Sequence, residues 1–471
     1  MEDINKIIKT RRHDLLKARI DTWNLCRDSY IGGEQYRAGQ HLDKYYKEHS
    51  ISYKDRLKRS IYINHVKPLA DILTGFLFSE KPQREFSKQI GYVETNLSKS
   101  QGIQSVMQNV ALQSMLYPVF VLVDSPSFDN SQILTKADRK AAGLNPFCTL
   151  YKYNEIRDFS TDDSGRLLWI LLDNSYIDKS NPLTPPVTKT VYRLWTREYF
   201  QDFTFAEKDE VSIGEQMSHG LGVVPGIFAG FPDLNNDSID SSLFESVSLM
   251  SKGIYNTVSA MQEKLYDSTF STLFFPLKSG EDLPDVIKKS GVGSLVVVPY
   301  CGELQGKPEY SQSGTVDIEP FLATVQLLTG EILKQVGMRD ASEKGIITNQ
   351  SGVALAIEFR KTESILLTIA TDLENVERSI IEIVQRWEGL QDKVVVSYSR
   401  DFKESDITSK LEQLYNLYTL PLESLQKSAL KRIVRTVLDD ASKEEMSEID
   451  QDIEQHMSAP ATFNAGDNIT V

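Results

Sequence analysis

The chain has 471 residues, of which 40% are hydrophobic and 25% charged, and its formal net charge at pH 7 is -14. This is the composition of a globular protein with material for about three domains, and it excludes a mostly disordered or collagen-like chain. The acidic balance argues against a protein that binds nucleic acid over its whole surface. Charge is uneven, because residues 1–68 are rich in Lys and Arg whereas the C-terminal region is acidic.

The cysteines and the N-terminus indicate a reducing compartment. Cys26, Cys148 and Cys301 lie far apart, so they predict neither a disulfide framework nor a metal site. The N-terminus has no apolar core of a signal peptide, and no apolar stretch approaches the length of a membrane span. We therefore expect neither secretion nor membrane insertion.

The first third of the chain is predicted to be mainly helical. Apolar residues at helical spacing predict an amphipathic helix over 4–30 and one or two helices over 53–78, interrupted at Pro68. A further helix is predicted over 103–116. The β-rich run "YPVFVLVDSP" that follows it is typical of a buried strand.

The middle of the chain is predicted to form an antiparallel sheet. Runs of β-branched and aromatic residues separated by turn residues occur at 147–160, 167–177, 190–205 and 210–214. The segment "GLGVVPGIFAGFPDLNND" that closes this region is predicted to be mostly loop.

Helices return in the second half. An apolar stripe from Leu243 to Leu265 predicts one helix, and a second is expected over 318–336. Between them lie two strand candidates, "STLFFPL" and "GSLVVVPY", and a short helix candidate, "DLPDVIKK". After a polar stretch, apolar residues alternate in steps of four and three from Leu355 to Trp387. That stripe predicts a helix of about 55 Å, followed by a strand at "KVVVSYSRDF".

Sequence motifs for enzyme chemistry are absent. The chain has no phosphate-binding P-loop, no dinucleotide fingerprint, no zinc-protease motif and no nucleophile elbow. The six histidines are scattered, and a lone His such as His65 is more often a core or surface residue than a catalyst. Acidic clusters such as "TDD" at 161–163 are typical of solvated turns. We expect no catalytic residues, no metal and no cofactor.

Four stretches, in this order and with these separations, resemble the portal proteins of tailed bacteriophages. They are "YKDRLKRSIYINHVKPLADILTGFLFSEKP", "LGVVPGIFAGFPDLNND" with the helix after it, "GTVDIEPFLATVQLLTGEILKQVGM", and the polar stretch leading into the long helix. The second of them is similar to the portal pattern of a Pro-containing strand, an Asn/Asp loop and the first stem helix. Together they cover about two-thirds of the chain. The strands over 147–214 resemble no part of the family closely, so they are assigned by their position only.

The resemblance implies an α+β fold of portal type, with a mainly helical wing and stem, a small antiparallel wing sheet, a small α/β clip and a helical crown. Carried onto this sequence, it assigns 1–240 and 390–404 to the wing, 241–268 and 318–337 to two stem helices, 269–317 to the clip, 338–350 to a tunnel loop, 351–389 to a long crossing helix, 405–457 to the crown and 458–471 to a disordered tail.

The resemblance also implies residue roles. Residues that face DNA on the tunnel loop would be Arg339, Lys344, Ile346, Asn349 and Gln350. Residues that pack the long helix in the oligomer would be Leu355, Phe359, Leu366, Ile369, Leu373, Val376 and Ile380. Residues that bind partners through the clip would be Lys278, Asp282, Lys288 and Lys289.

The implied function is a ring of about twelve subunits at one capsid vertex, in the virion after assembly in the host cytoplasm. Double-stranded DNA would be packaged through it by the terminase large subunit and later ejected, with head completion and tail adaptor proteins docked below. The major capsid protein and a scaffolding protein are further expected partners. Two alternatives stay open: another ring-forming head or tail connector, and an intracellular α/β enzyme with no recognisable motif.

Overall fold

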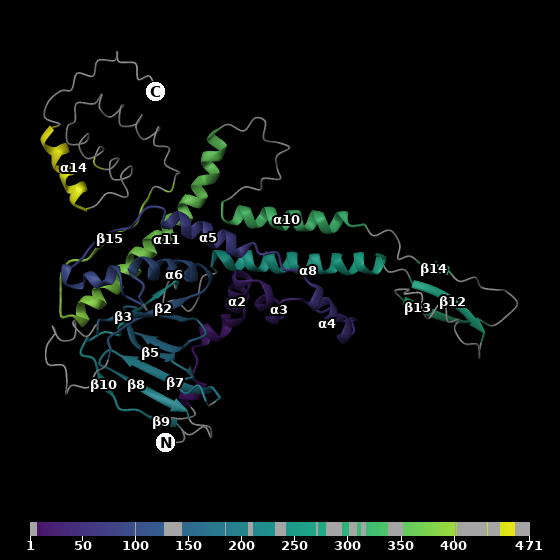
Figure 1. Cartoon of the computed structure of the whole chain (residues 1–471), viewed down its shortest axis with the longest axis horizontal. Coiled ribbons are helices and arrows are strands. Elements are labelled where there is room, and N and C mark those ends of the chain that lie inside the picture. The colour runs from purple at the N-terminus through teal and green to yellow at the C-terminus, as the bar shows by residue number, and fades with distance from the viewer. Residues whose placement is uncertain are drawn as a thin grey trace, which may run out of the picture. The chain divides into compact units, whose positions relative to one another are not determined.

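The computed structural model describes residues 7–98, 100–126, 144–183, 185–205, 211–230, 242–269, 272–278, 294–300, 309–311, 317–337, 352–400, 402, 431 and 443–456. The chain divides into two compact units, Met1–Arg400 and Asp401–Val471. Figure 1 shows the elements along the chain. The second unit contains α14 (Lys443–His456), an acidic helix within the expected crown; the rest of that expected crown, apart from Lys431, lies outside the described residues.

The N-terminal region forms a cluster of helices, which are α2 (Asp14–Ile31), α3 (Gly33–Ala38), α4 (Ser50–Arg59), α5 (Val66–Leu77) and α6 (Ile103–Leu116), with the 3₁₀ helix η1 (Lys88–Glu94). The helix predicted over 103–116 is confirmed. The helix predicted over 4–30 is broken at residues 11–13: residues 7–10 are helical, and α2 begins at Asp14.

Pro68 does not interrupt a helix, so that prediction is wrong. The break between α4 and α5 spans 60–65, and Pro68 lies in the first turn of α5. The first backbone N–H groups of a helix have no intrahelical acceptor, so the missing N–H of a proline there removes no hydrogen bond.

A three-stranded antiparallel sheet forms from β2 (Val119–Asp124), β3 (Phe147–Lys152) and β11 (Gly226–Ala229), in the order β11-β2-β3. The first five residues of β2 are buried, which confirms the predicted buried strand. β11 lies inside the segment predicted to be mostly loop, and it pairs Phe228 with Phe120.

A larger antiparallel sheet contains β4 (Ile156–Thr161), β5 (Leu167–Asp173), β7 (Val187–Thr196), β8 (Tyr199–Phe205) and β10 (Met217–Ser218), flanked by β6 (Tyr176–Asp178) and β9 (Val211–Ile213). The antiparallel sheet is therefore confirmed, but with seven strands it is not small. The described part of residues 1–240 is a mixture of helices and strands and is not mainly helical. The run 147–160 also divides at a turn, so that β3 and β4 belong to different sheets.

Two helices bracket a small sheet in the second half. The helices are α8 (Leu243–Thr269) and α10 (Glu319–Gln335), close to the predicted bounds. Between them β12 (Thr272–Lys278) pairs in parallel with β13 (Ser294–Tyr300) and antiparallel with β14 (Glu309–Ser311). Both strand candidates are confirmed, whereas the helix candidate at 282–289 lies outside the described residues.

The predicted long helix is α11 (Gly352–Trp387), followed by the short strand β15 (Val395–Ser397). β15 pairs antiparallel with β1 (Gln83–Glu85), which ties this part of the chain to the N-terminal region. α11 packs on β2, β11, α5 and α6, and the indole Nε1 of Trp387 donates a hydrogen bond of 2.9 Å to the carbonyl of Val123.

Candidate functional site

The helix pair α8 and α10 is the first part of the candidate site. The two helices lie side by side (Figure 1) and approach closely at Gly253, where a Cβ atom would stand 3.3 Å from Leu328 Cδ1. At the C-terminal end of α10, Ile332 and Val336 are fully buried. Small residues allow helix axes to approach and fix the register of their contact, so the pair is a defined unit.

The first half of α8 is held by the N-terminal helices. Phe244, Val247 and Tyr255 are buried there, and the helix packs against α2, α5 and α6. Arg19 of α2 forms an ion pair of 2.7 Å with Glu245 in the first turn of α8, where a negative charge also stabilises the helix dipole.

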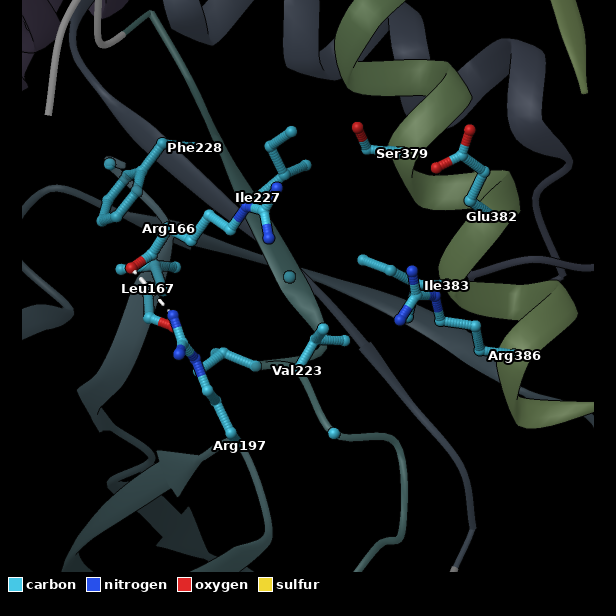
Figure 2. Close-up of a pocket in the computed structure, with 14 residues that line it drawn as sticks. Arg166, Leu167, Arg197, Val223, Ile227, Phe228, Ser379, Glu382, Ile383 and Arg386 are labelled. Carbon is cyan, nitrogen blue, oxygen red and sulfur yellow. Dashed lines mark hydrogen bonds between the residues drawn. The ribbon is translucent and has the colours of Figure 1, made fainter. Parts of the chain in front are cut away.

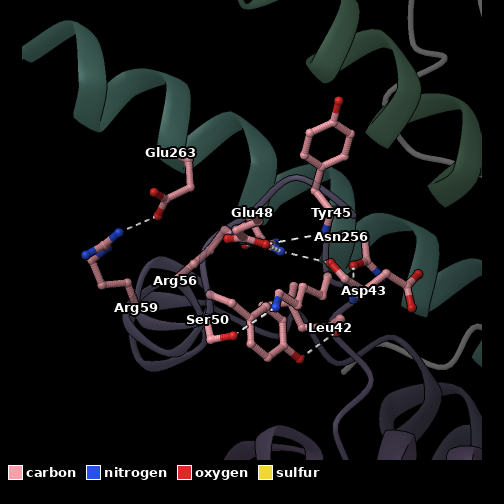
Figure 3. A network of polar contacts seen from close by, with 12 residues as sticks. Leu42, Asp43, Tyr45, Glu48, Ser50, Arg56, Arg59, Asn256 and Glu263 are labelled. Atoms are coloured by element: carbon pink, nitrogen blue, oxygen red, sulfur yellow. Dashed lines mark hydrogen bonds and ion pairs between the residues drawn. The ribbon is translucent and has the colours of Figure 1, made fainter.

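A polar network fixes the middle of α8 (Figure 3). The guanidinium of Arg56 binds both carboxylate oxygens of Glu48 at 2.9 and 2.8 Å and donates to the carbonyl of Asp43 at 2.8 Å. Its hydrogen bonds lower the pKa of the Glu48 carboxyl. Asn256 of α8 accepts from the backbone N–H of Asp43 at 2.8 Å, and Arg59 pairs with Glu263 at 2.6 Å. The segment 42–59 therefore braces α8 over two turns.

The C-terminal end of α10 is pinned to α11. The hydroxyl of Thr362 donates to the carbonyl of Val336 at 2.9 Å, and Lys361 Nζ donates to the carbonyl of Lys334 at 2.7 Å. Gly337 has φ of 74°, and a Cβ atom on it would lie 2.5 Å from Thr362 Oγ1. Only glycine fits this left-handed, tightly packed position. The chain therefore enters 338–350 from an anchored point.

The predicted packing residues of α11 have different environments. Leu366 and Ile380 are fully buried, and Leu373 and Val376 are 2% and 5% exposed. Ile369 is partly buried, and the side chains of Leu355 and Phe359 lie outside the described residues. The buried four are covered within the chain itself, so their predicted role in subunit contacts stays untested.

The predicted DNA-facing and clip residues are mostly outside the described part of the chain. This holds for Arg339, Lys344, Ile346, Asn349 and Gln350, and for Asp282, Lys288 and Lys289. Lys278 ends β12 and pairs with Tyr300 in the backbone register. The structure does not test the roles of these residues.

Exposed leucines on the helix pair were not singled out from the sequence. Leu327 and Leu322 of α10 are 63% and 47% exposed, and Leu249 of α8 is 54% exposed. The sequence does contain a signal, because "FLATVQLLTGEIL" is apolar around most of the helix circumference. A helix of that kind is typically buried on more than one side.

The described residues offer little for metal or thiol chemistry. Within them no group of three or more His, Cys, Asp or Glu side chains is placed to hold a metal ion. Burial raises the pKa of the Cys26 thiol to about 12, so this thiol stays protonated near neutral pH. No helix in the described part is long and apolar enough to cross a membrane.

No protein-family model matches the sequence, and no curated protein matches it significantly. Among solved structures, the chain is similar to a chain of the virion of a native gene transfer agent (GTA) particle, with 12% identity, a TM-score of 0.41, and coverage of 89% of this chain and 93% of that one. It is also similar to a chain of the neck of a native GTA particle computed with C12 symmetry, with 10% identity, a TM-score of 0.39, and coverage of 83% and 89%. TM-scores of this size do not establish a shared fold.

Proposed function

We propose that this chain is a portal protein of a phage-like particle, a structural protein and not an enzyme. About twelve copies form a ring at one capsid vertex of the virion. Double-stranded DNA enters through the ring, driven by a terminase, and later leaves through it. Head completion and tail proteins dock on the residues between α8 and α10, and the major capsid and scaffolding proteins contact the outer part.

The observation that carries this proposal is the exposure of the α8/α10 pair. Leu249, Leu322 and Leu327 stand on a helix pair that contacts the rest of the chain mainly through α8 as far as Glu263 and through the end of α10. Burying a leucine contributes about 1.5–3 kcal/mol, so copies of the pair that pack side by side around an axis would gain stability at each interface. In a closed ring every subunit forms the same two interfaces, so the exposed leucines of every copy are buried in the same way.

The anchored end of α10 supports the proposed tunnel loop. The stretch 338–350 has few core-building residues, and it begins next to Gly337, which is locked against Thr362. Such a segment needs no burial and can face a channel, while α11 holds its base through Leu366, Leu373 and Ile380. Arg339 and Lys344 would be the cations on this loop.

The charge balance suits a conduit for DNA. Each Lys or Arg that pairs with a phosphate releases counterions and adds salt-dependent affinity, which would hold the duplex back. A ring of chains that each carry a net charge of -14 repels phosphates on average. A few loop cations would then centre the duplex without trapping it.

Electron microscopy of the purified chain tests the proposal. We expect rings of about twelvefold symmetry with a central hole lined by α8 and α10. A compact monomer at all concentrations would reject the ring and favour an enzyme. A ring whose hole is lined by the β4–β10 sheet instead of α8 and α10 would favour a different head or tail connector.

A further inference from the structure

An open cleft lies between α11 and two turns of the strand-rich region (Figure 2). It is lined on one side by Ser379, Glu382, Ile383 and Arg386 of α11, and on the other by the β4–β5 turn at 165–167 and the segment that leads into β11. Its volume is about 380 Å³. That is large enough for one or two side chains of a peptide and within the usual range for a ligand site.

Two arginines extend into this cleft from opposite walls. Figure 2 shows the guanidinium groups of Arg166 and Arg386 both directed into it. Both residues are exposed, and among the described residues neither guanidinium has a hydrogen bond or an ion pair. Arg197, which also lines the cleft, is engaged, because it pairs with Asp162 at 2.6 Å and donates to the carbonyl of Leu167 at 2.9 Å. Since Arg197 is paired and Glu382 is the one carboxylate among the lining residues, Arg166 and Arg386 give the cleft a net positive charge.

The turn that carries Arg166 is held in place. The carboxylate of Asp162 accepts the backbone N–H groups of Ser164 and Arg166, both at 3.0 Å, and the hydroxyl of Ser164 at 2.8 Å. Gly165 takes a left-handed conformation with φ of 76°. The hydrogen bond from Arg197 is the main reason that the pKa of Asp162 lies well below its usual range. A fixed turn and a helix lose little conformational entropy when a ligand binds between them.

The rest of the cleft is mainly apolar. Val223, Ile227 and Ile383 line it, and Ile383 is buried to 7% exposure. The carboxylate lining the cleft belongs to Glu382, and Figure 2 shows it on the side of Ser379, turned away from the guanidinium of Arg386. The cleft thus combines two cations with an aliphatic wall.

We infer that this cleft binds an acidic peptide segment of a partner protein. A carboxylate lies between Arg166 and Arg386, and a neighbouring aliphatic side chain covers Val223 and Ile227. Arginine binds carboxylates with paired, charge-assisted hydrogen bonds, which are stronger than neutral ones. This chain is acidic overall, so a local cationic cleft would select where an acidic partner docks. The inference does not rest on ring formation.

Duplex DNA fits the cleft less well. Protein contacts to DNA go largely to phosphate and sugar oxygens on the outside of the helix. Such a ligand would leave the apolar wall formed by Val223, Ile227 and Ile383 without a partner. An acidic peptide supplies both the anion and the aliphatic group.

The test measures binding of a fluorescein-labelled peptide of alternating glutamate and isoleucine to the full chain by fluorescence anisotropy. We expect R166Q and R386Q each to weaken binding about tenfold, as the loss of one charge-assisted hydrogen-bond pair implies. K54Q is the matched control, because Lys54 is an exposed cation on α4, outside the cleft lining. A peptide with glutamine in place of glutamate should not bind, and V223S should weaken binding of the acidic peptide.

Three results would overturn the inference. The acidic peptide does not bind to the wild type, it binds to R166Q and R386Q as tightly as to K54Q, or the glutamine peptide binds to the wild type as tightly as the acidic peptide does. Displacement of the peptide by a short DNA duplex whose own binding needs both arginines would also overturn it, in favour of a phosphate site. Thermal melts of all variants establish that they fold. R386K adds a further check, because it keeps the charge but loses the planar fork and should bind less tightly than the wild type.

Discussion

A buried ion pair and its hydrogen-bond partners connect four segments: β1, α6, α11 and the residue that follows β15. Arg84 of β1 and Glu377 of α11 pair with 5% and 0% of their side chains exposed. Glu377 also accepts a hydrogen bond of 2.6 Å from the hydroxyl of Tyr398, which follows β15, and Arg84 donates to Gln104 at 2.8 Å. Every polar group of this pair is engaged, which is the condition under which buried charges are tolerated.

Replacing one partner of this pair should therefore be costly. We expect R84M to lower the free energy of unfolding by about 3–5 kcal/mol, because it leaves the carboxylate of Glu377 buried without a cation. Urea denaturation measures the change. The triple variant R84M/E377M/Y398F removes both charges and the hydroxyl that would lose its acceptor, so it should recover most of the loss. Equal destabilisation by the single and triple variants would contradict this account.

Asp28 gives a prediction on pH dependence. It is 2% exposed; burial raises the pKa of its carboxyl, but hydrogen bonds from His41, Arg27 and Gln35 outweigh this and lower it. A carboxyl group whose pKa is lowered on folding stabilises the folded state at pH values above its ordinary pKa of 3.8. This stabilisation is lost as the pH falls below 3.8 and through the lowered pKa. We expect D28N to be less stable than the wild type by about 1–3 kcal/mol at pH 7.

The difference in the free energy of unfolding between the wild type and D28N should become smaller as the pH falls below 3.8. Urea denaturation between neutral and acidic pH measures it. D163N is the control, since Asp163 is exposed, and its stability should follow the wild type at every pH. A gap between wild type and D28N that stays constant with pH would show that the charge of Asp28 is not the source of the effect.

At the scale of elements, long periodic segments could be predicted and short pairings could not. The helices α6, α10 and α11 follow from their apolar spacing to within a few residues. The residue pattern alone did not predict the four-residue strand β11, because its strand conformation depends on pairing with β2, and pairing is a tertiary contact; only the resemblance implied a strand in this stretch. The break predicted at Pro68 is wrong, because a proline in the first turn of a helix, where Pro68 lies in α5, is tolerated and only one further inside breaks the helix.

The junction between α10 and α11 can be tested at Gly337. G337A places a Cβ atom 2.5 Å from Thr362 Oγ1 at a positive φ, so we expect a loss of about 1–3 kcal/mol in the free energy of unfolding. G330A is the control, because a Cβ atom there meets no atom within 4 Å. In a helix interior that change should raise stability by about 0.5–1 kcal/mol. Equal effects of the two variants in urea denaturation would contradict the proposed packing.

At the scale of the whole molecule, the resemblance to portal proteins predicted two kinds of feature. The helices can be checked in a single chain, whereas the contacts between subunits cannot. Leu366 and Ile380 lie on the predicted stripe, and the chain buries them itself. The apolar spacing alone could not distinguish burial within a subunit from burial between subunits, because both bury the same face. Leu322 and Leu327 of α10, which are not part of that stripe on α11, are among the large apolar residues that the isolated chain leaves exposed.

Assembly should therefore depend on the exposed leucines of the helix pair. We expect L327D to leave the thermal stability of the monomer nearly unchanged, since Leu327 is 63% exposed, and to prevent ring formation, because it would place an unpaired charge at a subunit interface. L183D is the matched control: Leu183 is 91% exposed on a turn between strands, and rings should form as in the wild type. Light scattering coupled to size exclusion measures the mass of each variant, and electron microscopy images it. Rings of L327D with normal mass and symmetry would show that α10 does not pack against a neighbouring subunit at this position. The exposure of these leucines would then no longer support the proposed function.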